Sequence, residues 1–136
     1  MAERILVAND QTGKQKLKDF ASLSAPLVSA ITSLTGSSTL QLNSNYMEEH
    51  IVIGTSVAGG VTAKAEIFGS SNVADGKKIV LIGNSNISPI TLSKTAPVQS
   101  KQIYLQSDAV LGQGSSLTLI FNSSLDAFVE VSRSIL

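Results

Sequence analysis

Beyond Gly36 the chain alternates short runs of β-favouring residues with clusters of Gly, Ser, Asn and Asp. Runs of this kind, each ended by turn residues, are typical of β-strands. The predicted strands are residues 38–43, 50–56, 62–68, 77–83, 89–93, 102–106, 116–122 and 127–133. About eight short strands with no helical pattern between them predict a mainly β protein, a single antiparallel β-sandwich or barrel of jelly-roll type.

Alternation along a strand predicts which side chains reach the core, because successive residues point to opposite faces of a sheet. In the last two predicted strands the side chains expected inside are Leu117, Leu119, Phe121, Val129 and Val131. Phe128 and Glu130 are then expected on the opposite face. The final strand is expected to pair inside the sheet, with Ile135 and Leu136 buried at a sheet end or a subunit boundary.

Residues 79–82, Ile-Val-Leu-Ile, contain no polar alternate. A strand that is apolar on both faces is typically covered on both faces. The cover is expected to be either a helix of the same chain or another subunit. Val80 and Ile82 are therefore candidate residues of an interface between subunits.

The first 36 residues differ in pattern from residues 37–136, so an N-terminal unit is expected to precede the β-sandwich domain. Residues 1–13 are predicted to form an arm or short strand, closed by the turn-forming sequence Asn-Asp-Gln-Thr-Gly. The candidate residues for contacting a partner are Arg4, Ile5, Leu6, Val7, Lys14, Lys16 and Lys18. The three lysines fit either a solvated face or a contact with an acidic surface.

Residues 14–34 carry apolar side chains at spacings of three, four and seven, the period of one helix face. The apolar positions, which are also candidate trimer contacts, are Leu17, Phe20, Leu27, Ile31 and Leu34. Pro26 suits a first turn but not a helix interior, so two helical pieces are expected, with Ser24 capping the second and Gly36 ending it. The stripe either packs against sister helices around a symmetry axis or covers one end of the chain's own β-domain.

Composition limits the classes of partner. The 136 residues predict one main domain. Ten basic and ten acidic side chains cancel, which removes the positive field that nucleic-acid binding normally needs. Only 15% of the residues are charged, whereas 43% are hydrophobic and 30 are Ser or Thr. Such a surface is expected to bury against copies of itself with little desolvation of ions. No apolar run is long enough to span a membrane, and no secretory signal is recognisable at the N-terminus.

Residues of the types that form catalytic or metal-binding sites are sparse. Cysteine is absent, which removes disulfides and thiolate metal sites. His50 is the single histidine, and its neighbours Glu48 and Glu49 lack the spacing of a metal motif. No nucleophile-elbow motif is present, and residues 69–78 do not match a phosphate-binding loop. The sequence therefore predicts no enzyme, no cofactor and no metal.

Four stretches of the second half resemble the small β-domains of bacteriophage virion proteins, such as capsid decoration proteins, head fibres and tail-fibre ends. The stretches are Gly76 to Asn84, Ile90 to Leu92, Gly114 to Phe121 and Phe128 to Ser134. The sequence departs from the pattern at Phe128, where many relatives have Trp. The resemblance implies a homotrimer, with β-domains around a threefold axis and a separate N-terminal segment attached to the virion.

Three functions are compatible with these observations. The first is a trimeric capsid decoration (cement) protein, assembled in the host cytoplasm, that binds the major capsid protein or another virion protein and stabilises a phage head. A start Met followed by one compact domain favours this expectation over a fragment of a long fibre. The second is a tail-fibre, spike or baseplate component that contacts a host receptor. The third is a carbohydrate-binding β-sandwich module.

Overall fold

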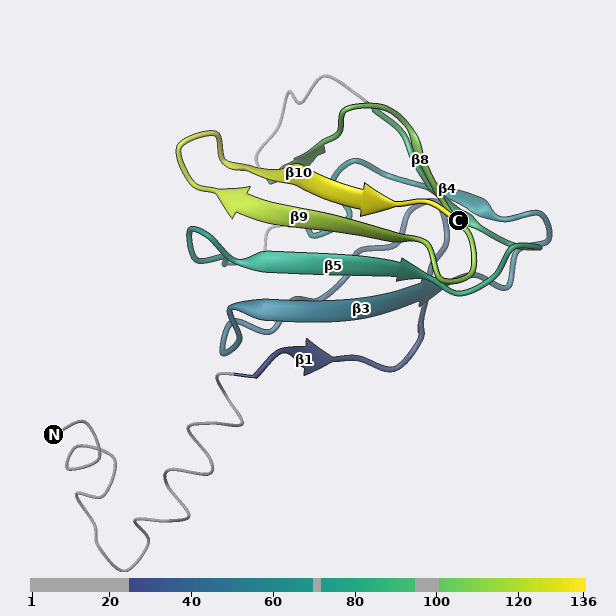
Figure 1. The fold of residues 1–136 in the computed structure, drawn as a ribbon, viewed down its shortest axis with the longest axis horizontal. Helices are drawn as coiled ribbons and strands as arrows, with labels where there is room; N and C mark the ends of the chain where they lie inside the picture. Colours follow the sequence, from purple (N-terminus) through teal and green to yellow (C-terminus); the bar gives the residue numbers. More distant parts are fainter. Residues whose placement is uncertain (1–24, 70–71, 95–100) are drawn as a thin grey trace, which may run out of the picture.

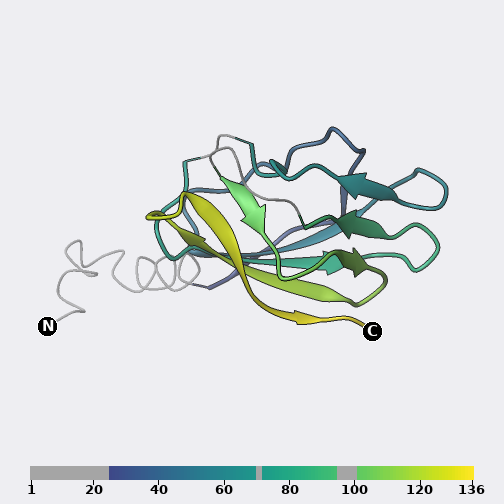
Figure 2. The same ribbon diagram turned by 90° about the horizontal axis from the view of Figure 1, so that it is seen from above.

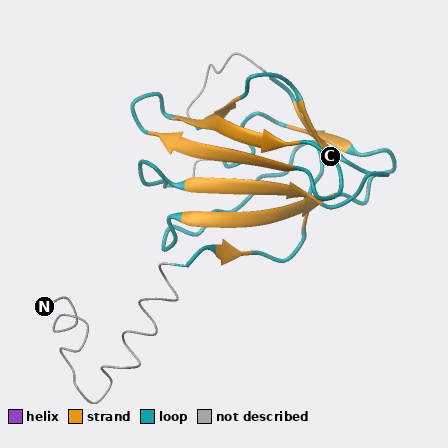
Figure 3. Cartoon of the chain, in the orientation of Figure 1, coloured by secondary structure: helices purple, strands orange, loops and turns teal. Residues whose placement is uncertain are grey.

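The computed structural model describes residues 25–69, 72–94 and 101–136, which form two layers of strands (Figure 1, Figure 2). Within these ranges no helix is formed (Figure 3). The strands are β1 (Leu27–Val28), β2 (Thr32–Ser33), β3 (Glu48–Gly54), β4 (Val61–Ala63), β5 (Lys78–Gly83), β6 (Ile90–Leu92), β7 (Gln102–Tyr104), β8 (Ala109–Leu111), β9 (Ser116–Asn122) and β10 (Ala127–Ser134). The prediction of a mainly β protein is confirmed.

The larger layer is a seven-stranded sheet in the order β1-β3-β5-β9-β10-β7, with β2 also pairing with β3. This sheet is mixed, so the predicted purely antiparallel arrangement is wrong. β3 is parallel to β5, β10 is parallel to β7, and β1 and β2 are both parallel to β3. Parallel neighbours need a crossover connection, which is usually a helix. Here the crossover from β3 to β5 passes through β4 of the other sheet, so parallel pairing arises without any helical pattern.

The smaller layer is a three-stranded sheet in the order β4-β6-β8, which lies over one face of the larger sheet (Figure 2). β4 is parallel to β6, and β6 is antiparallel to β8. Its core-facing side chains include Ile90, Leu92 and Leu111, each no more than 2% exposed. We call the covered face of the larger sheet its inner face and the other its outer face.

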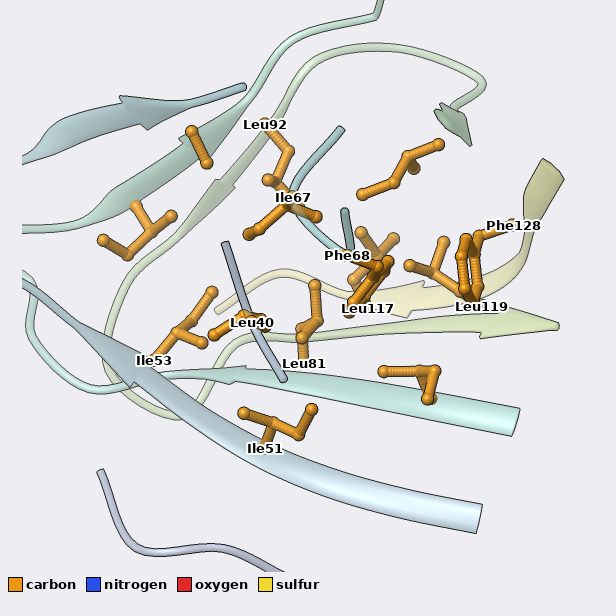
Figure 4. Packing of buried hydrophobic residues seen from close by; sticks show 14 of the residues in the cluster. Leu40, Ile51, Ile53, Ile67, Phe68, Leu81, Leu92, Leu117, Leu119 and Phe128 are labelled. Carbon is orange, nitrogen blue, oxygen red and sulfur yellow. The ribbon is translucent and has the colours of Figure 1, made fainter. Parts of the chain in front are cut away.

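Between the two layers lies one hydrophobic core (Figure 4). Phe68 and Phe128 lie within it with ring centroids 4.4 Å apart. Leu40 and Ile67 also belong to this core, although the segments that contain them do not form the strands predicted over residues 38–43 and 62–68. A single backbone hydrogen bond, from the N–H of Leu40 to the carbonyl of Ile67, joins these two segments.

The C-terminal hairpin has β10 between β9 and β7, which confirms that the last strand pairs inside the sheet. The prediction for its faces is wrong, since Phe128 is fully buried and Val131 is 50% exposed. The cause is the register, because Phe128 lies opposite the core residue Phe121, with ring centroids 5.1 Å apart. A β-bulge between Glu130 and Ser132 then displaces Val131 from the ladder.

The chain ends beyond this hairpin on two apolar residues. In the single chain Ile135 is 48% exposed and Leu136 is 85% exposed, in contrast to the expected burial at a sheet end. The N–H of Leu136 donates a hydrogen bond to Oγ of Ser115, 3.0 Å away, which holds the terminus beside the turn before β9.

The helix expected to continue as far as Leu34 does not form in the described residues, which instead contain β1 and β2. The N–H of Ser29 donates to the carbonyl of His50, and the N–H of Leu34 donates to the carbonyl of Gly54. Pairing with the edge of β3 thus satisfies the backbone groups that a helix would have satisfied internally. Val28, Ile31 and Thr32 are β-branched and favour this extended form. Residues 1–24, with the predicted arm and the first helical piece, lie outside the described residues.

Three loops gather where β3 and β5 end, and we call this region the loop end: residues 55–60, 84–89 and 112–115 (Figure 1). Its backbones pack so closely that a Cβ on Gly83 would lie inside contact distance of the carbonyl oxygen of Gly112. The N–H of Gly83 donates to the carbonyl of Ser115, and the N–H of Gly114 donates to that of Gly83. The two loops are therefore fixed to each other by their main chains.

Candidate functional sites

The outer face of the seven-stranded sheet carries a patch of aliphatic side chains. Strand alternation brings them there, because their neighbours in sequence fill the core. The register places Val52 opposite Ile82, and Ile120 opposite Val129. We call this the outer patch; it consists of Val52, Val80, Ile82, Ile120 and Val129.

Each member of the outer patch is half-buried by its neighbours in the single chain. Val28 of β1 lies opposite His50, on the same face, and is 68% exposed. Figure 1 shows β3, β5, β9 and β10 side by side, and the second sheet lies on their other side. The outer patch therefore lies on the face of the larger sheet that the second sheet does not cover, where His50, Lys78 and Thr118 alternate with its aliphatic side chains.

The predicted trimer contacts fall on different surfaces. Val80 and Ile82 both belong to the outer patch, as alternation required. Leu34 is 1% exposed within the chain's own core, and Leu27 is half-buried on β1. Ile31 is 60% exposed between β1 and β2.

The other predicted site residues precede the described part of the chain. They are Arg4, Ile5, Leu6, Val7, Lys14, Lys16, Leu17, Lys18 and Phe20. Val52, Ile120 and Val129 were not predicted as members of the patch. The alternation over residues 116–122 places Ile120 outside, whereas Val129 was expected inside, and that prediction is wrong. The strand order then brings the three residues onto one face with Val80 and Ile82.

One end of the outer face is charged. Nε2 of His50 lies 2.6 Å from Oε2 of Glu48, and both side chains are about one-third exposed. Glu48 also lies opposite Lys78 in the ladder between β3 and β5. Among the described residues no three His, Cys, Asp or Glu side chains gather as a metal ligand set would. His50 is thus engaged by a carboxylate at the border of the outer patch.

A buried ion pair lies on the inner side of the larger sheet, near the starts of β3 and β5. Nζ of Lys77 is 2.5 Å from Oε2 of Glu49, and the two side chains are 2% and 4% exposed. The ammonium also donates to the carbonyl of Asn43, and the carboxylate accepts from the N–H of Asn43. The pair therefore fastens the segment before β3 to the start of β5.

A second ion pair fixes the bulged part of β10. Arg133 donates from Nε and Nη2 to the carboxylate of Glu130, and its guanidinium also donates to the carbonyls of Ser107 and Asp108. The N–H of Gln106 is a further donor to Glu130. The hydrogen bond from Arg133 lowers the pKa of Glu130 more than burial raises it, and the same bond raises the pKa of Arg133.

A hollow of about 690 Å³ opens beside the edge of the larger sheet, between β1, β3 and the segment from Thr39 to Ser44. Leu40, Leu42 and Ile51 supply its apolar surface. Ser29 and the buried carboxylate of Glu49 supply polar groups. The sequence did not indicate this site, because its walls come from segments that the sheet topology brings together.

None of the described segments is a helix of the length and apolarity needed to cross a membrane. Comparison with known proteins finds no matching family model, no matching curated protein and no matching solved structure.

Proposed function

We propose that this chain is a structural protein of a bacteriophage virion, in the first place a trimeric decoration protein that clamps capsid subunits and has no catalytic role. The observation that carries the proposal is the outer patch. Val52, Val80 and Ile82 form one aliphatic group on the outer face, and Ile120 and Val129 form a second one beside Lys78. These side chains are free to bury against another protein surface. Apolar patches of this kind on soluble proteins mark interaction sites.

The position of the resembling stretches supports the same proposal. They contain β5, β6, β9 and β10, and β5, β9 and β10 are consecutive neighbours in the larger sheet. The outer patch draws four of its five members from these three strands. The part of the sequence that resembles virion β-domains is thus also the part that carries most of the proposed interface.

The first experiment is the solution mass by light scattering at several concentrations, compared with the 14.2 kDa chain. We expect a trimer, and we expect it to bind undecorated phage heads in electron micrographs. The variant Val80→Lys places a charge in the outer patch and is expected to lower the mass to that of a monomer. Val110→Lys is the matched control, because Val110 is 49% exposed on β8 of the other sheet.

A folded monomer that binds no capsid at micromolar concentration would overturn the proposal. A Val80→Lys variant that is folded and still trimeric would show that the outer patch is not the trimer interface. Circular dichroism and the melting temperature separate these outcomes from misfolding. Val80→Thr, which keeps the shape and replaces one methyl group with a hydroxyl group, gives a second and milder variant.

A tail-fibre, spike or baseplate role is the alternative that a specific observation favours. The loop end contains no charged side chain over residues 54–63, 83–93 and 109–122, and it exposes Ile87 to 85% and Val57 to 42%. β1 begins at the opposite end of the sheet, beside the start of β3 (Figure 1). A chain anchored through its N-terminal segment would present the loop end outward, toward a host surface. Binding to host cells that Ile87→Asp abolishes, while capsid binding is absent, would favour this alternative.

A further inference from the structure

His50, the single histidine, lies on the outer face of the larger sheet beside the outer patch. In the ladders of β3 it stands between Val28 of β1 and Val80 of β5. Val28 is 68% exposed, and Val80 is a member of the outer patch. Val52, another member, lies two residues further along β3 and therefore on the same face. A protein surface that covers this part of the outer patch therefore also covers His50.

Two charged side chains stand beside His50 at this end of the outer face. Nε2 of His50 is 2.6 Å from Oε2 of Glu48, and Glu48 lies opposite Lys78 in the ladder between β3 and β5. Glu48 and Lys78 carry opposite charges and balance each other. The adjacent residues Glu49 and Lys77 are buried on the inner side and are paired with each other. While His50 is neutral, this end of the outer face therefore has no net charge.

His50 is the group at this end that changes charge near neutral pH. Histidine ordinarily titrates between pH 5 and 8, whereas carboxylates and lysines titrate outside that range. Among the described residues, β1 faces His50 with Val28, and β5 faces it with Val80 and Lys78. On its own strand the charged neighbour on this face is Glu48. Protonation of His50 therefore adds a positive charge that is left in excess, because Lys78 already balances Glu48.

We propose that protonation of His50 weakens the association of copies of this chain through the outer patch. This inference rests on the proposed trimer and identifies what regulates its interface. A positive charge that loses water on association costs free energy unless a counter-charge compensates it. Symmetry-related copies bring the same residue to the interface, so the cost recurs in every subunit. The free chain then binds the proton more readily than the assembled chain, and by linkage acidification favours dissociation.

The test is the mass of the full chain by light scattering, over a concentration series at about pH 7.5 and about pH 5.5, within the range in which histidine titrates. We expect a trimer at the higher pH. The concentration at which half of it dissociates is expected to be about tenfold higher at the lower pH, because the protonated fraction of an ordinary histidine rises about tenfold between these values. Circular dichroism at both pH values shows whether the chain remains folded.

Two variants test the charge at position 50. His50→Gln keeps a hydrogen-bonding side chain but does not titrate, so its dissociation is expected to differ by less than about twofold between the two pH values. His50→Lys carries its charge throughout this range and is expected to be mainly monomeric at the higher pH as well.

The matched control is Val110→His in the His50→Gln background. Val110 is 49% exposed on β8 of the other sheet, so this variant restores one histidine to the chain away from the outer patch. Its dissociation is expected to stay as independent of pH as that of His50→Gln. A return of the pH dependence in this control would show that the effect does not come from the outer face.

The inference is overturned by a trimer whose dissociation is the same at both pH values, or by a trimer that is tighter in acid. It is also overturned if His50→Gln keeps the pH dependence of the parent chain. These three outcomes leave the proposed trimer intact. A folded chain that is monomeric at both pH values would instead contradict the proposed association itself, and this inference with it.

Discussion

Lys77 shows how a single residue can connect segments that are distant in sequence. Its ammonium is buried beside Glu49 and reaches the carbonyl of Asn43, which joins the start of β5 to the turn before β3. A buried pair of this kind is weak evidence for net stability, but removal of one partner leaves a charge in the core. The pair is therefore expected to specify how β3 and β5 meet more than to strengthen the fold.

We predict that Lys77→Met destabilises the protein by about 3–5 kcal/mol, because Glu49 is then buried without a counter-ion. The double variant Lys77→Met with Glu49→Leu is expected to recover most of the loss. Lys78→Met is the control, since Lys78 lies on the outer side of the same strand, and it is expected to change stability by less than about 0.5 kcal/mol. Urea unfolding measures all four proteins. A double variant as unstable as the single one would contradict the prediction.

Glu130 gives the fold a defined acid sensitivity. Because Arg133 lowers its pKa in the folded state, the unfolded chain binds more protons on acidification. The stabilisation from this carboxylate is complete above its unfolded pKa of about 4.3 and is lost as the pH falls through the lower folded pKa. We predict that Glu130→Gln reduces the fall in urea midpoint between neutral and acidic pH. Parallel pH profiles for the two proteins would exclude this role.

At the scale of elements, the hairpin of β9 and β10 decides which side chains enter the core. Alternation alone permits two orientations of β10 relative to the core. Because Val129 and Val131 are aliphatic, the local pattern favours the orientation in which they face the core, which is not the observed one. Pairing of Phe128 with Phe121 selects the observed facing, and the ion pair with Arg133 makes Glu130 acceptable inside. An aromatic contact and a bulge thus outweigh the local pattern.

This facing is testable with two substitutions in one strand. Phe128→Ala is expected to destabilise the protein by about 3–5 kcal/mol, because a fully buried ring is lost from the core. Val131→Ala, at a 50% exposed position, is expected to cost less than about 0.5 kcal/mol. Guanidinium unfolding measures both. A larger cost for Val131→Ala than for Phe128→Ala would show that β10 faces the other way.

At the scale of the whole molecule, the two sheets leave the outer face of the larger sheet, with the outer patch, outside the shared core. If copies of the chain cover the outer patch, folding is coupled to association, and the melting temperature depends on concentration. We predict a rise in melting temperature on increasing the protein from micromolar to hundreds of micromolar, and no such rise for Val80→Lys. Scanning calorimetry at each concentration provides the measurement. Identical melting temperatures throughout would indicate that the face remains uncovered.

The sequence determined those features of the protein that depend on local alternation and composition. Residues 116–122 were predicted with their observed bounds and with Leu117, Leu119 and Phe121 facing the core. The apolar run at residues 79–82 likewise lies in a strand, β5, which buries Ile79 and Leu81 and places Val80 and Ile82 on the outer face. These features follow from a period of two along each strand, which is written in consecutive residues.

The tertiary structure alone decided the strand order, the parallel pairs, the strands at Leu27–Val28 and Thr32–Ser33, and the hollow beside them. The apolar residues with helical spacing up to Leu34 did not form a helix, because the edge of β3, a distant part of the chain, provides hydrogen-bond partners for their backbone. Backbone partners in a sheet are chosen across the fold, so no local window of sequence contains them. The same reason explains why the outer patch, whose residues come from β3, β5, β9 and β10, could be located only after the strands were placed side by side.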